Sequence, residues 1–183
     1  SEGDWGDGSF SHKVADTVQA ARFMRETGRP VELLVGHSFG GAAVIAAARD
    51  IPEADAVATI GAPYDPSHVE HQYDAVVDRV LAHGEAPVQF GDRALVLRRA
   101  FVEDVRQADL QKAIRTLHRP LLVMHSPTDN TVSIANASDI FQTARHPRSF
   151  VSLEGSDHLL TARGQARRAA RIISAWVDQY LMD

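Results

Sequence analysis

The 183-residue sequence predicts an α/β protein with a doubly wound, mainly parallel sheet. Two apolar runs, Val31–Val35 and Ala56–Pro63, lack the polar–apolar alternation of a strand exposed on one face. Such runs are typical of strands covered by helices on both faces. A stretch with helical character separates them, and strand–helix–strand units define the α/β class. With 44% hydrophobic and 23% charged residues, we expect a single domain over residues 1–183.

The N-terminal part of the chain is expected to supply a loop, a helix and the first strand. Ser1–Ser11 is rich in glycine, serine and aspartate, which predicts a loop. Ser11 then caps a helix over His12–Thr27, where apolar residues recur at helical spacing. The strand Val31–Val35 follows, and the small residues of Gly40–Arg49 predict the next helix.

The segment 64–118 interrupts this rhythm, and we interpret it as a helical and hairpin lid inserted above the sheet. A helix rich in histidine and charge, Pro66–His83, is expected first. A β-hairpin follows, because apolar residues alternate on both sides of a tight turn at Gly91-Asp92. The amphipathic stretch Val102–Leu117 completes the lid.

The strand–helix rhythm resumes after the lid. Pro120–Ser126 and Arg148–Gly155 are predicted as strands, and Val132–Ala144 as the helix between them. A long helix over about Thr161–Met182 closes the predicted fold. The loops after these strands are expected at the carboxyl edge of the sheet, where ligands bind in this class of fold.

Composition excludes several classes of function. The chain carries 19 Lys and Arg residues against 24 Asp and Glu, a net charge of −5, so no nucleic-acid partner is expected. It contains no cysteine, which excludes a disulfide framework, a thiolate metal site and a cysteine nucleophile. Its apolar runs are too short to span a bilayer and no signal-type segment opens it, so we expect a cytoplasmic protein with no membrane partner.

The pentapeptide Gly36-His37-Ser38-Phe39-Gly40 lies between the first strand and the helix after it. In a G-x-S-x-G nucleophile elbow, small neighbours permit a strained serine whose hydroxyl is lifted above the sheet. The helix N-terminus and the Phe39 N–H would then stabilise an oxyanion. The alternative is that small residues merely let a strand and a helix pack, which explains the glycines but not Ser38. The placement therefore predicts a nucleophile.

A serine hydroxyl becomes a nucleophile only when a base accepts its proton, and an acid orients that base. Asp129 follows the predicted strand Pro120–Ser126, and His158 follows Arg148–Gly155. Both therefore fall at the carboxyl edge of the sheet, in the chain order serine, aspartate, histidine that this scaffold uses. The less well placed candidates for the acid and the base are His118, His125, His146, Asp139 and Asp157.

Three histidines of the lid raise the question of a metal site. His68 and His71 are spaced to share one helix face, and His83 lies further along the same predicted helix. No third ligand at a recognised spacing follows the pair, so a solvated histidine-rich surface is the favoured interpretation. We therefore predict no metal site.

A resemblance to a known family rests on the segments GHSFGGAAV, AVATIGAPYDPSHV, RPLLVMHSPTDNTV and RSFVSLEGSDHLLT, and on the F-x-x-D-x-R pattern of Phe101–Arg106. The chain resembles an α/β-hydrolase over nearly its whole length. More narrowly, it is similar to hydrolase domains fused to an osmotically-inducible-protein-C-like domain in some bacterial proteins. The resemblance implies Ser38 as nucleophile, Asp129 as acid and His158 as base, with ester or thioester hydrolysis and no cofactor. It also implies such a fused domain in the full-length protein.

Hydrolases of this family have about four strands ahead of the nucleophile elbow, whereas this sequence has none, so we expect an N-terminally truncated domain. The second oxyanion N–H normally comes from a loop in that part of the fold. Val31–Val35 would then be an apolar edge of the sheet, and open edges pair with other chains. We therefore expect self-association through this strand.

The leading hypothesis is a serine hydrolase that cleaves a small-molecule acyl ester or thioester through an acyl-enzyme intermediate. A binding or interaction module with a dead site is one alternative, because a missing oxyanion donor would impair catalysis. Acyl transfer or cofactor-free perhydrolysis by the same three residues is another. The lid contains several large apolar or aromatic residues, which favour an apolar acyl or alkyl group in the substrate. These residues are Tyr64, Tyr73, Phe90, Leu97 and Phe101.

Overall fold

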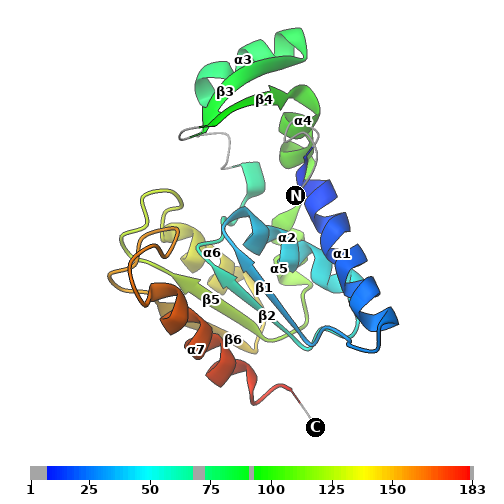
Figure 1. Ribbon diagram of the computed structural model, residues 1–183, viewed down its shortest axis with the longest axis vertical. Helices are drawn as coiled ribbons and strands as arrows, with labels where there is room; N and C mark the ends of the chain where they lie inside the picture. Colours follow the sequence, from blue (N-terminus) through cyan, green and yellow to red (C-terminus); the bar gives the residue numbers. More distant parts are fainter. Residues whose placement is uncertain (1–7, 68–72, 91–92, 182–183) are drawn as a thin grey trace.

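A four-stranded parallel sheet forms the centre of the protein (Figure 1). The computed structural model describes residues 8–67, 73–90 and 93–181. The strands stand in the order β1 (Leu33–His37), β2 (Ala56–Ile60), β5 (Leu121–His125) and β6 (Arg148–Ser152), and each neighbouring pair is parallel. The predicted α/β fold with a mainly parallel sheet is thus confirmed.

Neighbouring residues of the central strands point to opposite faces of the sheet, and both faces are apolar. Val57 and Val123 belong to the hydrophobic cluster on one face, while Ala58 and Met124 belong to the cluster on the other. All residues of β5 are buried. Burial on both faces explains why these strands read as continuous apolar runs.

Helices cover both faces of the sheet. On one face α1 (Phe10–Glu26) packs against α2 (Phe39–Ala47), and α5 (Leu110–Arg115) lies between α2 and α6 (Ala135–Thr143). On the other face α7 (Gln165–Val177) contributes Ala169 and Ile173 to the second cluster. The sheet is therefore doubly wound. In the part of the chain that the structure describes, no helix is both long enough and apolar enough to cross a membrane.

A smaller unit stands above the sheet, at the top of Figure 1. This hairpin unit consists of α3 (Asp74–His83), the antiparallel strands β3 (Glu85–Phe90) and β4 (Arg93–Arg98), and α4 (Arg99–Gln107). The fully buried Leu97 lies at its centre. The hairpin confirms the predicted alternation of apolar residues, and its turn, Gly91-Asp92, lies outside the described residues.

The first helix begins earlier than predicted, and Ser9 rather than Ser11 caps it. The Ser9 side chain accepts a hydrogen bond from the His12 N–H (3.0 Å). Ser11 lies inside the helix and binds Asp104 of α4 through its N–H (2.9 Å) and its hydroxyl. Phe10, the first helical residue, is buried. Burial of this ring moves the start of α1 towards the N-terminus.

The predicted amphipathic stretch Val102–Leu117 belongs to two helices, α4 and α5. α4 ends at Gln107, the backbone of Ala108 is extended, and the side chain of Asp109 caps α5. α5 then packs against α2 and α6. This part of the segment 64–118 therefore joins the helix layer over the sheet, whereas α3, β3, β4 and α4 form the hairpin unit.

Two other helices are shorter than predicted. α7 begins at Gln165, because Gly164 has a left-handed backbone (φ 90°) that cannot continue a helix from Thr161. Within the predicted helix Pro66–His83, α3 is observed from Asp74 onwards, and residues 68–72 lie outside the described residues.

Candidate active site

A single residue, Ser38, joins β1 to α2. Its backbone has φ 53° and ψ −129°, a strained combination that costs on the order of 1–3 kcal/mol. The Ser38 N–H donates to the carbonyl of Ile60 in β2 (2.8 Å), and the Gly41 N–H donates to the Ser38 carbonyl (2.8 Å). The neighbouring strand and the following helix therefore hold the strained turn in place.

Two glycines make this turn possible because they lack a Cβ. A Cβ on Gly36 would lie 2.4 Å from the Gly40 carbonyl oxygen, and one on Gly41 would lie 2.6 Å from the Cβ of Ala62. A Cβ on Gly40 would meet nothing within 4 Å. Of the two glycines in the predicted pentapeptide, Gly36 is thus required by close packing, while Gly40 has open space beside it. Gly41, just outside the pentapeptide, is the second required glycine.

Ser38, His158 and Asp129 form one chain of hydrogen bonds. The Nε2 of His158 lies 3.0 Å from the Ser38 Oγ, and its Nδ1 lies 2.6 Å from the Asp129 Oδ2. Because a carboxylate only accepts, Nδ1 carries the proton and Nε2 accepts from the serine hydroxyl. The structure thus brings together the three residues singled out in the sequence, with the imidazole in the tautomer that can take the Ser38 proton.

The carboxylate of Asp129 is held in its charged form by its own loop. Its Oδ1 accepts from the N–H groups of Thr131 (2.8 Å) and Val132 (2.9 Å), and its side chain is 2% exposed. Burial alone would raise the pKa of Asp129. The hydrogen bonds from Val132, His158 and Thr131 and the attraction to the His158 ring outweigh burial, so the pKa of Asp129 is lowered. The residue therefore faces His158 as a carboxylate at neutral pH.

The loops that carry Asp129 and His158 are tied to each other. The Ser126 hydroxyl donates to the Ser156 carbonyl (2.5 Å), and the Thr128 hydroxyl donates to the same oxygen (3.3 Å). Ser126 and Ser156 are both buried. Since β5 and β6 are paired in register, these loops start side by side, and the two hydroxyls fix their spacing.

Asp157, one of the weaker candidates for the acid, organises the histidine loop instead. Its carboxylate accepts from the N–H groups of Leu159 (2.9 Å) and Thr161 (3.1 Å) and from the Thr161 hydroxyl (2.7 Å). The hydrogen bonds from Thr161 lower the pKa of Asp157. The Asp157 side chain is thus engaged with the residues that follow His158, whereas the carboxylate of Asp129 binds the His158 ring.

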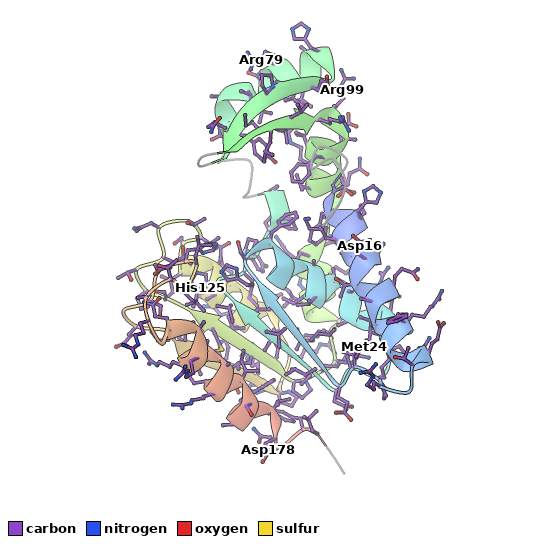
Figure 2. All side chains as sticks on the ribbon, viewed as in Figure 1. Asp16, Met24, Arg79, Arg99, His125 and Asp178 are labelled. Atoms are coloured by element: carbon purple, nitrogen blue, oxygen red, sulfur yellow. The ribbon has the colours of Figure 1, made fainter. Side chains whose placement is uncertain are left out.

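His125, the one competing histidine at the carboxyl edge, is the last residue of β5, just before the loop that carries Asp129 (Figure 2). It is fully buried, and its Nε2 lies 2.8 Å from the Val132 carbonyl oxygen and 3.6 Å from the Asp129 Oδ2. Because the carbonyl only accepts, Nε2 carries the proton. The remaining candidates are all exposed. His118 lies before β5, His146 lies before β6, and Asp139 lies on α6.

Gly61 is a site residue that the sequence reasoning missed. It follows β2 and has a left-handed backbone (φ +58°). A Cβ there would lie 3.3 Å from the Asp129 Oδ2 and 3.4 Å from the His158 ring. Gly61 therefore leaves room for the Asp129–His158 pair. Its signal in the sequence is only a glycine at the end of a buried strand, which is also common in ordinary turns.

Phe39 opens α2, so its N–H lies in the first turn, where backbone N–H groups have no partner within the helix. Its ring packs against Phe10 (centroids 5.4 Å apart) and against Phe101 of α4 (6.2 Å). The ring centroid of Tyr73 lies 6.1 Å from that of Phe101. This aromatic row, Phe10, Phe39, Phe101 and Tyr73, connects the elbow to the hairpin unit.

The other apolar residues predicted to shape a substrate pocket have separate surroundings. The Tyr64 N–H donates to Asn136 of α6, and its hydroxyl lies 3.1 Å from the Thr143 hydroxyl oxygen. Leu97 is buried inside the hairpin unit, and the Phe90 side chain lies outside the described residues. Phe101 and Tyr73 are therefore the predicted residues that the structure links to the elbow.

The described residues contain no group of three histidine, aspartate or glutamate side chains arranged to hold a metal ion. His68 and His71, which raised that alternative, lie outside the described residues. A groove of about 730 Å³ runs between α1, α2, α4 and α5, and Ser38, Asp129 and His158 are not among its lining residues. The groove and the hydrogen-bonded chain are thus separate features of the molecule.

Comparison with known proteins identifies relatives. The family described as "Alpha/beta hydrolase family" matches residues 2–171. The esterase domain of a Rhodothermus marinus protein is 43% identical, with a TM-score of 0.77 over 96% of this chain and 71% of that chain. No curated protein matches the sequence.

Two further solved structures are similar in fold alone, because their sequence identities are low. The α/β hydrolase GrgF from Penicillium sp. sh18 has a TM-score of 0.78 at 12% identity, covering 96% of this chain and 73% of that chain. A monoacylglycerol lipase from Paleococcus ferrophilus has a TM-score of 0.69 at 16% identity, covering 96% and 77%.

Gly41→Ala is expected to lower the free energy of unfolding by about 1–3 kcal/mol, because the new methyl group would overlap the Cβ of Ala62. Gly40→Ala is the matched control. Its methyl group has open space, and alanine is about 0.5–1 kcal/mol more favourable than glycine within a helix. Urea denaturation of both variants measures the difference, and equal destabilisation would contradict the packing argument.

The lowered pKa of Asp129 predicts a pH-dependent contribution to stability. A carboxyl with a lower pKa in the folded chain stabilises the fold above its unfolded pKa of about 3.9, and this contribution is lost as the pH falls through the folded pKa. Asp129→Asn removes it. The difference in unfolding free energy between wild type and Asp129→Asn should therefore shrink as the pH falls from about 6 to about 3.

Urea midpoints across that pH range measure this effect. Asp139→Asn, which removes an exposed carboxyl of α6, controls for the loss of one negative charge. A wild-type advantage over Asp129→Asn that stayed constant with pH would mean that the carboxylate of Asp129 does not stabilise the fold.

Proposed function

The chain belongs to the α/β hydrolase family, and from the geometry of its site we propose that it is a serine hydrolase that cleaves a carboxylic ester or thioester through an acyl-enzyme intermediate. The observation that carries this proposal is the chain of hydrogen bonds from the Ser38 Oγ through His158 to Asp129. The 43% identical esterase domain from Rhodothermus marinus supports an ester as the substrate.

Acylation follows from the position of the His158 Nε2. This nitrogen accepts the Ser38 proton while the serine oxygen attacks the carbonyl carbon, and the carbonyl electrons move to its oxygen. The resulting imidazolium gives the proton to the leaving alcohol or thiol as the bond to that group breaks. Water then attacks the acyl-serine with His158 again as base, which releases the carboxylic acid and restores Ser38.

Asp129 and Phe39 stabilise the charges that develop in these steps. The Asp129 Oδ2 lies 2.6 Å from the His158 Nδ1. The carboxylate therefore favours the imidazolium and holds the neutral ring with its proton on Nδ1. The Phe39 N–H, at the positive end of the α2 dipole, is the donor for the oxyanion. One such donor contributes roughly 10²–10³-fold in rate in known hydrolases.

The surroundings of the site favour an apolar acyl or alkyl group in a small-molecule ester. Leu159, next to His158, presents an apolar side chain that is 69% exposed. The aromatic row reaches the elbow from the other side through Phe39. We propose that the segment 64–118, with the hairpin unit as its projecting part, acts as the lid of this site.

The same three residues would also support acyl transfer to an alcohol or perhydrolysis with peroxide. Each reaction forms the same acyl-serine, and they differ only in the acceptor that attacks it. Product analysis with water, an alcohol or peroxide as acceptor distinguishes them. Accumulation of the free carboxylic acid in every case identifies the protein as a hydrolase.

We also propose that β1 supports self-association of this chain. In the described sheet β1 pairs with a strand on one side only, β2, and Val35 on it is 48% exposed. Exposed strand edges pair with other chains, and a lysine there opposes such pairing. Light scattering should therefore detect dimers or larger species for the wild type and fewer for Val35→Lys. A wild type that stays monomeric at every concentration contradicts this proposal.

The narrower family resemblance extends the proposal to the architecture of the full-length protein. We propose that it joins this domain to an osmotically-inducible-protein-C-like domain. Sequencing the complete open reading frame that encodes this chain tests this directly. A frame that encodes a hydrolase domain and no second domain would refute it.

Ser38→Ala and His158→Ala are each expected to lower kcat for a p-nitrophenyl ester by about 10⁴–10⁶-fold, because each removes one partner of a unit that acts together. Labelling by a fluorophosphonate probe should be lost in Ser38→Ala. Ser174→Ala, an exposed serine on α7, is the matched control and should label like the wild type. Undiminished labelling of folded Ser38→Ala, or no labelling of the wild type, would refute the proposed function and favour a non-catalytic binding module.

A further inference from the structure

We propose that His37 is a positioning residue for the reaction: its imidazole holds the backbone of His158, so that the His158 Nε2 stays aimed at Ser38. This inference rests on the proposed function and adds a fourth side chain to it. His37 ends β1 and directly precedes Ser38, so one turn of the chain carries both the nucleophile and the group that holds the base.

The contact between the two histidines is a hydrogen bond from side chain to backbone. The His37 Nε2 lies 2.7 Å from the His158 carbonyl oxygen. Because a carbonyl only accepts, the His37 Nε2 carries a proton and donates it. The two rings also lie beside each other, with centroids 4.9 Å apart and planes tilted by 45°. His37 thus touches both the main chain and the ring of the base.

His37 is itself firmly placed. It is opposite Ile60 in the parallel register of β1 and β2, and it is partly buried. The residue after it is tied to the same Ile60 by the 2.8 Å hydrogen bond from the Ser38 N–H. The donor of the contact therefore belongs to the sheet, whereas the acceptor belongs to a loop.

That loop needs anchors, because part of its backbone is strained. Leu160, two residues after His158, has φ 55°, a left-handed conformation that is unfavourable for a residue with a branched side chain. Such a conformation persists only where surrounding contacts hold it. Asp157 holds one side of the loop through Leu159 and Thr161, and His37 holds the carbonyl of His158 itself.

The two anchors of His158 act on different parts of the residue. Asp129 binds the ring at Nδ1 and sets its rotation, while His37 binds the main chain and sets the position from which the ring extends. Proton transfer requires the His158 Nε2 to stay at about the 3.0 Å from Ser38 Oγ that the structure has. Without the His37 donor, the His158 carbonyl loses this hydrogen bond while the Asp129 bond to the ring survives.

A misplacement of about 1 Å costs on the order of 10²-fold in rate. We therefore expect His37→Leu to lower kcat for a p-nitrophenyl ester by about 10–100-fold. KM should change less than about twofold, because the hydrogen bond that is lost joins two protein groups and does not involve the substrate. His37→Gln keeps an N–H donor at similar reach and is expected to recover kcat to within about threefold of the wild type. His146→Leu, an exposed histidine between α6 and β6 and outside the segment 64–118, is the matched control.

Circular dichroism and thermal unfolding establish that each variant is folded, and His37→Met replaces His37→Leu if the latter is not. Proton NMR gives a second measurement: the Nδ1–H resonance of His158 should stay sharp in the wild type and in His37→Gln, and broaden in the apolar variant. Equal kcat in the apolar and Gln variants, or a loss confined to KM, would overturn the positioning role. Loss of activity in Ser38→Ala with no effect of His37→Leu refutes this inference alone, whereas an active Ser38→Ala refutes the proposed function.

Discussion

The single-residue turn at Ser38 is the constraint on which the rest of the site depends. It forces β1 and α2 so close together that a Cβ on Gly36 or on Gly41 would overlap its neighbours. The strained serine backbone is held by a hydrogen bond to β2, and its hydroxyl is thereby aimed at His158. A longer, relaxed connection would keep the strand and the helix but would release the hydroxyl from this direction.

Parallel pairing turns this local geometry into a site. Because β1, β2, β5 and β6 run in the same direction and in register, the loops that follow them meet at one edge. Each loop contributes one element: the serine turn, the gap at Gly61, the carboxylate of Asp129 and the imidazole of His158. Hydroxyls and carbonyls then fix the loops against one another, so the spacing of the serine, aspartate and histidine side chains is set by the sheet and by loop-to-loop bonds together.

Much of this arrangement could be predicted from the chain, and the exceptions have physical reasons. The continuous apolar runs identified the buried strands, and the polar residues after them identified Ser38, Asp129 and His158. The cap at Ser9 was missed because Phe10 is buried by tertiary contacts that local spacing does not reveal. The sequence analysis did not divide the stretch Val102–Leu117 at Ala108, because both halves are amphipathic, although the Asp109 cap of α5 is a local signal for the division.

The sequence by itself determined the elements, their order and the chemical groups at the ends of the strands, because periodicity, turn residues and side-chain chemistry act over short distances along the chain. Only the tertiary structure decided which groups touch. Gly61 beside the Asp129–His158 pair and His37 on the His158 carbonyl are contacts between distant segments, set by strand register and loop packing. The requirement for Gly41 rather than Gly40 has the same origin, since it depends on where Ala62 lies across the turn.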